Sequence, residues 1–387
     1  MPKTFVLAPD SFKESMTALE ACQAMQSGLQ KVFPDAYFIL YPMADGGEGT
    51  VDTIINAQHG QKIDIEVMGP LPSQRISTYF GLINQGKTAI IEMAKANGIH
   101  LLSSEQRDPL LTSTYGTGEM IRLALDHGVS QIIIGLGGSV TNDAGMGMAT
   151  ALGVKFLDQE KQPVRLGGGY LNDIQFIDIS EIDQRLNNVE IIIASDVNNP
   201  LLGPNGASHV FGPQKGASPE IVIQLESNLT HFANLIEKQL NITVQDIAGS
   251  GAAGGLAAGL LVFTQAKIQS GVETVINLLD MQHTIQQADY VFTGEGGIDF
   301  QTKFGKTPIG VARLAHTYDK PVFVCAGYMG EGIESLYEEG ITAIFGILDQ
   351  SSDLKTALQN GPKNLSRCCE NIARLIRSID ASTFKNE

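Results

Sequence analysis

Short apolar runs alternate with helical stretches at both ends of the chain. The runs have the length of buried strands and lie at 4–8, 36–41, 289–292, 321–326 and 341–348. Apolar residues recur at helical spacing in the stretches that accompany them, at 17–31, 51–58 and 364–379. This alternation at both ends, with a different pattern between, predicts one parallel-sheet domain that an inserted domain interrupts.

The middle of the chain begins with that different pattern. Between residues 62 and 93 apolar and polar positions alternate in segments separated by turn residues, which predicts antiparallel strands. Buried strands follow at 132–134 and 189–194, and helices at 115–127 and 219–239. We therefore expect a two-domain α/β fold, with limits of 1–64 and 278–387 for the discontinuous parallel-sheet domain and 65–277 for the inserted mixed α/β domain.

The stretch Gln131–Gly153 combines a strand, a glycine turn and the start of a helix. Its glycines at 135, 137 and 138 permit positive φ and let a ligand approach the backbone. Four polar side chains follow closely: Ser139, Thr141, Asn142 and Asp143. Outward N–H donors at such a turn suit a phosphate or carboxylate group. The alternative is a tight strand-to-helix turn whose polar residues only cap the helix.

Acids and lysines recur in loops at the ends of other strands. Ligands of open α/β sheets bind outside the carboxyl ends of strands, so these side chains are candidates for chemistry. They are Asp10 and Lys13 after the first strand, Asp45 and Glu48 beside two glycines after the second, Asp196 after 189–194, and Glu295, Asp299, Thr302 and Lys306 after 289–292. Several have a structural alternative, because acids also cap helices and stabilise turns.

Two glycine motifs match nucleotide-binding patterns but fit their surroundings poorly. Residues 81–88, GLINQGKT, satisfy the P-loop pattern, yet 82–83 continue a strand and 84–87 make a better hairpin turn. Residues 249–254, GSGAAG, satisfy the dinucleotide pattern, but no convincing strand precedes them. We expect a closely packed glycine and alanine helix there.

The composition limits the partners of the chain. A net charge of −16 argues against a nucleic-acid or anionic-membrane partner, which would require a basic face. The longest apolar stretch, 254–263, is too short to span a bilayer. The four cysteines, Cys22, Cys325, Cys368 and Cys369, have no metal-binding spacing and are typical of reduced thiols in a cytoplasmic protein.

Acidic loops with few lysines and many small polar donors match the needs of phosphoryl transfer. In that chemistry Mg²⁺ neutralises charge and lysine steadies the transferred group. The seven histidines show no paired metal spacing, which disfavours a zinc hydrolase.

Five long motifs occur in order along nearly the whole chain. They are APDSFKES at 8–15, ADGGEGT at 44–50, GGSVTNDAG at 137–145, SDVNNPL at 195–201 and TGEGGIDFQTKFGK at 293–306. Together they resemble the bacterial glycerate kinase family that lacks a P-loop, the type 1 glycerate kinases, and so does GAAGGLAAGL at 251–260. Val140 and Ala144 stand where the family pattern has Ala and Gly, and neither supplies a functional group.

The resemblance implies ATP- and Mg²⁺-dependent phosphorylation of D-glycerate, an organic acid, to a phosphoglycerate. It also implies two α/β domains, one of them a discontinuous flavodoxin-like or Rossmann-like parallel sheet, with the active site in the cleft between them. We favour 2-phosphoglycerate over 3-phosphoglycerate as the product. The sequence itself decides neither the hydroxyl that reacts nor whether the chain forms a homo-oligomer.

We assign roles to the candidates from their chemistry and place. Asp196 is the leading candidate for the general base, and Lys13 and Asp45 are also assigned to catalysis. Substrate and phosphate binding is assigned to the 137–143 loop side chains named above together with Asp10, Thr302 and Lys306, and metal binding to Asp45, Glu48, Glu295 and Asp299.

Two functions from other classes remain as alternatives. An NAD-dependent oxidoreductase of small hydroxy acids would use Gly249–Gly254, and glycerate would then change the absorbance of the cofactor. A non-catalytic small-molecule sensor would bind glycerate or ATP without forming a product.

Overall fold

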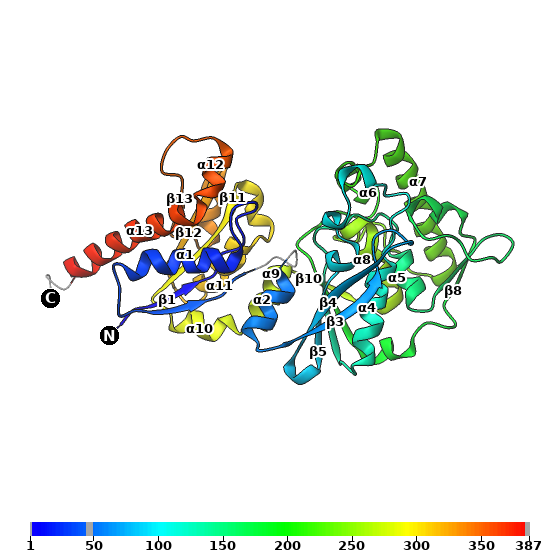
Figure 1. Ribbon diagram of the computed structural model, residues 1–387, viewed down its shortest axis with the longest axis horizontal. Helices are drawn as coiled ribbons and strands as arrows, with labels where there is room; N and C mark the ends of the chain where they lie inside the picture. The colour runs from blue at the N-terminus through cyan, green and yellow to red at the C-terminus, as the bar shows by residue number, and fades with distance from the viewer. Residues whose placement is uncertain (1, 44–48, 384–387) are drawn as a thin grey trace. The chain divides into compact units, whose positions relative to one another are not determined.

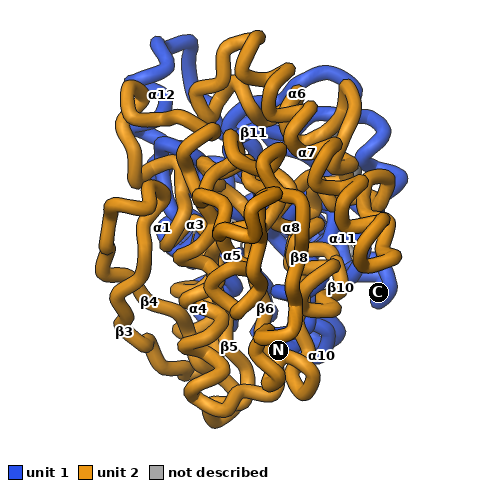
Figure 2. Tube along the Cα trace, turned by 90° about the vertical axis from the view of Figure 1, so that its right-hand side faces the viewer, with its two compact units in different colours: residues 1–45, 272–387 blue, residues 46–271 orange. Residues whose placement is uncertain are grey.

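The computed structural model describes residues 2–43 and 49–383, which form two compact units (Figure 2). Unit 1 comprises Met1–Asp45 and Val272–Glu387, and unit 2 comprises Gly46–Gly271. Both limits lie nearer the N-terminus than the expected 64/65 and 277/278. The first differs because the helix at 50–57 packs against the strands at 75–83 and 88–92, and the strand at 61–68 pairs with the same sheet.

Unit 1 is built on a five-stranded parallel sheet. Its strands are β1 (Thr4–Leu7), β2 (Tyr37–Leu40), β11 (Tyr290–Ile298), β12 (Val322–Met329) and β13 (Ala343–Gly346), in the spatial order β13-β12-β11-β1-β2. Numbered within the unit, the strands run 2-1-3-4-5 from the β2 edge, which is the flavodoxin order. The predicted parallel sheet is confirmed, and its order reverses between β1 and β11.

Helices lie between and after these strands. They are α1 (Ala18–Gln30), α9 (Gly271–Leu278), α10 (Met281–Gln287), α11 (Thr307–His316), α12 (Leu354–Gln359) and α13 (Gly361–Thr383), with 3₁₀ turns η7 (Phe300–Phe304) and η8 (Ile333–Glu339). Thr17 and Glu20 form a capping box that starts α1. Helices α1 and α13 lie side by side (Figure 1), so closely that a Cβ on Gly28 would come within 2.0 Å of the Ser366 carbonyl oxygen.

Unit 2 contains a six-stranded mixed sheet. Its strands are β3 (Gln61–Met68), β4 (Arg75–Ile83), β5 (Thr88–Glu92), β6 (Gln131–Gly135), β9 (Glu190–Ala194) and β10 (Lys267–Gln269), in the spatial order β10-β9-β6-β5-β4-β3. The pairs β3–β4 and β4–β5 are antiparallel, as the alternating pattern predicts, and β5, β6, β9 and β10 are parallel. A separate ribbon joins β7 (Lys155–Leu157) and β8 (Phe176–Asp178). The fold is therefore α/β with a parallel sheet and a separate mixed sheet, as expected.

The helices of unit 2 connect and cover these strands (Figure 1). They are α2 (Thr50–Ala57), α3 (Ala94–Asn97), α4 (Tyr115–Asp126), α5 (Met146–Ala151), α6 (Ala207–Phe211), α7 (Pro219–Leu240) and α8 (Ala252–Thr264). Short 3₁₀ turns lie at η1 (Asn84–Gly86), η2 (Ile99–Leu101), η3 (Ser104–Gln106), η4 (Gly168–Asp173), η5 (Gln184–Asn188) and η6 (Pro213–Lys215).

Both glycine motifs have structural roles in unit 2. The P-loop-like segment forms the β4–η1–β5 hairpin, with Leu82 paired to Ala89, so the hairpin prediction is confirmed. The second motif leads into α8, which packs closely as expected. Its first turn, however, is not a regular helix, because Ala253, Gly254 and Gly255 have φ values of 54°, 67° and 84°.

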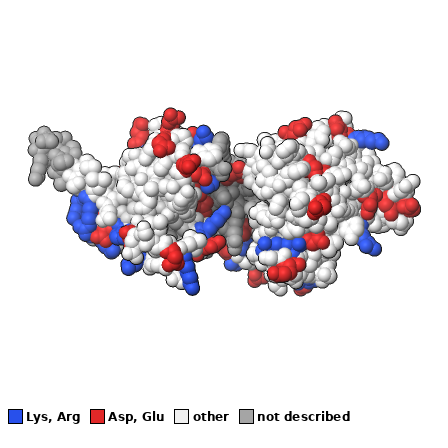
Figure 3. All heavy atoms as spheres, turned by 90° about the horizontal axis from the view of Figure 1, so that it is seen from above, with Lys and Arg blue, Asp and Glu red and all other residues white. Residues whose placement is uncertain are grey.

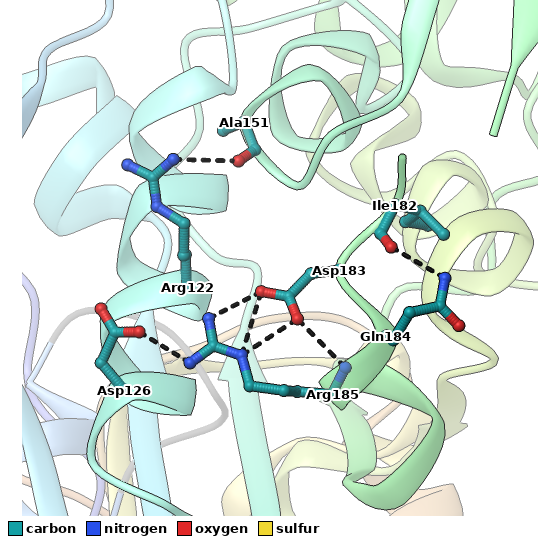
Figure 4. A network of polar contacts seen from close by, with 7 residues as sticks. All are labelled: Arg122, Asp126, Ala151, Ile182, Asp183, Gln184 and Arg185. Atoms are coloured by element: carbon teal, nitrogen blue, oxygen red, sulfur yellow. Dashed lines mark hydrogen bonds and ion pairs between the residues drawn. The ribbon is translucent and has the colours of Figure 1, made fainter. Parts of the chain in front are cut away.

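The surface of the protein carries acidic and basic groups side by side. Figure 3 shows no extended basic face on the side that it draws. Figure 4 shows one exposed network, in which the Arg185 guanidinium contacts Asp183 and Asp126 at 2.7 Å each and connects η5 to the end of α4. Exposed pairs of this kind contribute little to stability.

The described part of the chain has no helix long and apolar enough to cross a membrane. All four cysteines are free thiols, as the sequence predicts, and the structure places all of them in the interior. The sulfur atoms of Cys325 and Cys369 lie 3.9 Å apart.

Candidate functional site

The first candidate site lies in unit 1, where the sheet order reverses. The loop after β1 crosses beside β11, since the Asp10 amide donates to the Gly294 carbonyl over 2.8 Å. The Asp10 carboxylate accepts from the Ser11 amide at 2.6 Å and from the Thr307 hydroxyl at 2.8 Å. Asp10 therefore joins β1, β11 and the first residue of α11 at the carboxyl edge of the sheet, where ligands of this fold bind.

Glu295 lies in the same cluster. Its carboxylate accepts from the buried Thr302 hydroxyl at 3.1 Å and lies 3.5 Å from the Lys306 ammonium. Burial raises the pKa of Glu295 to about 7, and the nearby charge of Asp10 adds to this, while Lys306 and Thr302 act in the opposite direction. The carboxyl groups of Asp10 and Glu295 thus repel each other when both are ionised, and the charge of Lys306 offsets this repulsion only in part.

The N-terminus of α11 faces this cluster. Lys306 is its N-cap residue, no side chain caps the helix, and Pro308 stands in the first turn. The Thr307 hydroxyl already contacts Asp10. Pro308 has no N–H and the Ile309 amide donates to the Lys306 carbonyl, so this helix end favours an anion mainly through its dipole, which together with Lys306 suits phosphate oxygens.

Two other predicted residues lie at the border of the cluster. Lys13 is exposed, and its backbone passes over β11, because a Cβ on Gly296 would lie 3.3 Å from the Lys13 amide nitrogen. The Asp299 amide donates to the Thr302 hydroxyl over 3.2 Å. The structure thus brings Asp10, Glu295, Thr302 and Lys306 together, with Lys13 and Asp299 beside them.

The carboxylates of this cluster fit part of a magnesium site. Mg²⁺ commonly takes only one or two protein carboxylates and completes its shell with water and phosphate oxygens. A buried, incompletely compensated Glu295 beside Asp10 has that chemistry. Among the described residues no group of three or more His, Cys, Asp or Glu side chains could hold a metal. The predicted ligands Asp45 and Glu48 lie outside the described residues.

The second candidate site is the glycine loop after β6 in unit 2. Gly137 and Gly138 are exposed, and the predicted binding residues after them, Ser139 and 141–143, are buried. Gly138 has a φ of +74°, which the turn requires. Only the glycine turn therefore presents backbone to solvent.

Buried partners hold this loop from several directions. The Val140 amide donates to the Asn97 carbonyl over 3.0 Å, and the Val140 carbonyl accepts from the Thr112 hydroxyl at 3.0 Å. The start of α8 closes the other side, because a Cβ on Gly254 would come within 2.0 Å of the Thr141 carbonyl oxygen. Within the described residues, the Thr141 hydroxyl and the Asn142 amide nitrogen are buried without a hydrogen-bond partner.

Asp143 supports the helix start that follows the loop. Its carboxylate accepts from the amide and hydroxyl of Thr114 at 2.8 and 2.9 Å, and from the amides of Gly145 and Gly147 at 3.2 Å each. Burial raises the pKa of Asp143, whereas these four donors lower it. The capping alternative from the sequence therefore describes Asp143 well, although Gly145 is the N-cap residue of α5.

Lys215 reaches the same loop from η6 and is 1% exposed. Its ammonium donates to the Ser139 hydroxyl over 2.8 Å and to the Thr141 carbonyl over 2.7 Å. Burial lowers the pKa of Lys215 to about 7, and the charge of Asp143 partly offsets this. A lysine that is only partly protonated near pH 7 therefore lies beneath the glycine turn.

Asp196 follows β9, which pairs in parallel with β6. Its carboxylate accepts from the Ser270 hydroxyl at 2.7 Å and the Gly271 amide at 3.0 Å. Asp196 is half-buried at the same sheet edge as the glycine loop, since Ala194 pairs with Gly135.

Sequence reasoning missed three residues of these sites: Thr307, Thr114 and Lys215. Thr307 directly follows a predicted lysine and starts a helix, and a hydroxyl at that position is a recognisable anion-binding signal. Thr114 and Lys215 gave no such signal. Each acts through a partner distant in sequence, and the Lys215 contact spans 76 residues.

Known proteins match this chain over nearly its whole length. The model of the glycerate kinase family matches residues 5–377. A Haemophilus influenzae protein described as glycerate kinase is 49% identical over 96% of this chain and 98% of its own length. An Escherichia coli K12 protein described as glycerate 2-kinase is 46% identical over 95% and 96%.

A solved structure agrees as well. The crystal structure of a candidate glycerate kinase 2 from Salmonella typhimurium LT2 superposes with a TM-score of 0.84 at 43% identity, covering 98% of this chain and 99% of that one. From the family match, these relatives and this fold, we conclude that the chain belongs to the glycerate kinase family, a family of phosphotransferase enzymes.

Proposed function

We propose that the protein transfers the terminal phosphoryl group of ATP to D-glycerate in a Mg²⁺-dependent reaction, forming 2-phosphoglycerate. The observation that carries this proposal is the cluster of Asp10, Glu295, Thr302 and Lys306 at the switch point of a flavodoxin-order sheet. Acids, a lysine and a helix N-terminus at that place are the parts that bind a phosphate tail with its metal.

On the nucleotide side, we assign the phosphates to Lys306, the first turn of α11 and the exposed Lys13. We assign the metal to Glu295 and Asp299, with Asp10 beside them and Asp45 and Glu48 as further ligands outside the described residues. When bound, Mg²⁺ would neutralise charge on the phosphates.

The residues of this cluster have separate tasks in the transfer. The Lys306 ammonium lies 3.5 Å from the Glu295 carboxylate and would also contact the phosphates. Its positive charge therefore offsets the negative charge of both groups. The Thr302 hydroxyl holds the Glu295 carboxylate in one orientation. Ordered charges of this kind stabilise the transferred group without reorganising during the reaction.

On the acceptor side, we assign the glycerate carboxylate to the exposed Gly137–Gly138 turn and to Ser139. The buried Thr141, Asn142 and Asp143 then support this turn from within. We propose Asp196 as the base that takes the proton of the attacking hydroxyl, oriented by Ser270 and Gly271.

The choice of 2-phosphoglycerate is supported by one relative. The Escherichia coli protein described as glycerate 2-kinase is 46% identical over nearly the whole chain. We extend that regiochemistry to this protein as part of the proposal. A cytoplasmic location is a further prediction, and it is supported by the four buried free thiols, which suit a reducing compartment.

Phosphorus NMR of a reaction with ATP, Mg²⁺ and D-glycerate tests the proposal directly. We expect one new phosphomonoester signal that coincides with added 2-phosphoglycerate and is absent without Mg²⁺. A signal coinciding with 3-phosphoglycerate would correct the regiochemistry alone, whereas binding of both ligands without product would favour a sensor. Lys306→Met should reduce the rate strongly, and Lys238→Met, at an exposed lysine in the last turn of α7, is the matched control.

A further inference from the structure

We propose that Lys215 is a positioning residue for glycerate, which fixes the Ser139 hydroxyl as a hydrogen-bond donor to the substrate carboxylate. This inference rests on the proposed function. It begins with the placement of Lys215, whose side chain is 1% exposed although lysine is rarely buried without an ionised partner.

The hydrogen-bond partners of Lys215 are neutral, and the charge of Asp143 compensates its burial only in part. Its ammonium donates to the Ser139 hydroxyl and the Thr141 carbonyl over 2.8 and 2.7 Å, and none of the ion pairs among the described residues includes it. If the role were only structural, an apolar residue of similar length could fill this core position at pH 7 at a similar free-energy cost. We therefore expect the Lys215 ammonium beneath the loop to have a functional role.

The backbone that carries Lys215 is fixed. Gly216 has a φ of +97°, and a Cβ there would lie 2.3 Å from the Arg107 carbonyl oxygen. The Lys215 amide donates to the Gly212 carbonyl over 3.0 Å, and Ser218 then caps α7. The backbone from which the Lys215 side chain reaches the glycine loop is therefore held in one conformation.

The contact with Ser139 determines what the serine hydroxyl can do. The protonated form of Lys215 only donates, so Ser139 then accepts from it, which leaves the serine proton for another acceptor. Within the described residues the Ser139 hydroxyl donates to no other group. Ser139 is 7% exposed and directly follows the exposed Gly137–Gly138 turn, so its proton is available to a ligand on that turn.

The chemical match is to a carboxylate. A hydroxyl that accepts from an ammonium is polarised and becomes a better donor to an anion. The buried positive charge also favours a negative group on the turn above it, because little solvent screens the interaction. Glycerate carries one carboxylate, and we assign that group to Ser139.

The test is a double-mutant cycle with Lys215→Met and Ser139→Ala, measured at pH 7. Losing a hydrogen bond to a charged group should raise KM for glycerate by about 10- to 100-fold in each single variant. KM for ATP should stay within about 2-fold of the wild type, because this effect is confined to the acceptor. The double variant should be no worse than Lys215→Met, since Lys215 acts through Ser139.

Several outcomes would overturn the inference. They are an unchanged KM for glycerate in either variant, additive effects in the double variant, or equal loss of affinity for both substrates. If Lys215→Met does not fold, Ser139→Ala decides alone, with a raised KM in support and an unchanged KM against. Lys238→Met controls for the loss of one positive charge. A wild type that forms no phosphoglycerate refutes the proposed function instead, so the two failures are distinguishable.

Discussion

Lys215 predicts an unusual dependence of stability on pH. Burial lowers the pKa of its ammonium from 10.5 to about 7, with Asp143 acting in the opposite direction. Between pH 7 and 10.5 the unfolded chain therefore still binds a proton that the folded protein has released. A folded state that binds fewer protons gains stability as pH rises, so this group makes the protein more stable in alkali.

The size of the effect follows from the shift in pKa. Between pH 7 and pH 9 the folded state should gain about 2 kcal/mol from Lys215, at 1.36 kcal/mol per unit of pKa difference. Lys215→Met removes this gain. At pH 7 the substitution also removes the desolvation penalty but leaves Ser139 and the Thr141 carbonyl without their donor, at about 1 to 3 kcal/mol each. These terms nearly cancel, so the variant should match the wild type at pH 7 and be less stable at pH 9.

Thermal unfolding at pH 7, 8 and 9 measures this difference. For a unit the size of Gly46–Gly271, 2 kcal/mol corresponds to a divergence of Tm of about 5 °C between wild type and variant at pH 9. Lys238→Met, which loses an exposed lysine, should follow the wild type at all three values. Parallel curves for wild type and Lys215→Met would mean that Lys215 keeps an ordinary pKa and that the burial argument fails.

Three further predictions concern other residues. Burial holds the pKa of Glu295 near 7, so the folded carboxyl keeps its proton while the unfolded one loses it near 4.5, and stability falls as pH rises through this range. Glu295→Gln should therefore raise the free energy of unfolding at pH 8 by at most about 3 kcal/mol, and with it Tm, while kcat falls. A lower Tm would contradict this. Asp196→Asn should reduce kcat by about 10²- to 10⁴-fold at unchanged Tm, and near-normal turnover of the folded variant would reject Asp196 as the base. Gly254→Ala should cost several kcal/mol in denaturant titration, because its Cβ would lie 2.0 Å from the Thr141 carbonyl oxygen at a φ of +67°. Gly203→Ala, at a φ of +87° with nothing within 4 Å, is its control and should cost only about 1 to 2 kcal/mol; equal losses would show that the clash is relieved.

The sequence predicts the local elements of this protein well. Strand and helix periods depend on neighbouring residues, and the Asn84–Lys87 hairpin is recognised because alternation continues on both sides of it. The sequence predicts the exact limits of the two units less well. Strand β3 follows a helix that the sequence assigns to the first domain, and only its pairing with β4 joins it to unit 2. Such pairing depends on long-range contacts that periodicity does not encode.

The candidate site was predictable to the extent that its residues lie on strand ends. Asp10, Glu295 and Lys306 were identified in this way, because parallel strands bring their carboxyl ends to one edge. Lys215 was not, since a lysine between Pro213 and Gly216 has the pattern of a solvent-exposed loop. Its burial arises only when η6 packs beneath a loop 74 residues earlier in the chain.

The glycine loop explains why one motif contains residues with different tasks. Its exposed part is Gly137–Gly138, whereas the polar residues that make the motif recognisable face inward. Asp143 uses its carboxylate on four protein donors and has little capacity left for a ligand, while the buried Ser139 keeps a proton that it donates to no other described group. A polar group buried without partners is costly, and the elements around the loop match most of its inward groups, although the Thr141 hydroxyl and the Asn142 amide nitrogen have no partner among the described residues. The motif therefore extends well beyond the ligand contacts, because a turn that binds an anion through bare backbone needs a rigid polar layer beneath it.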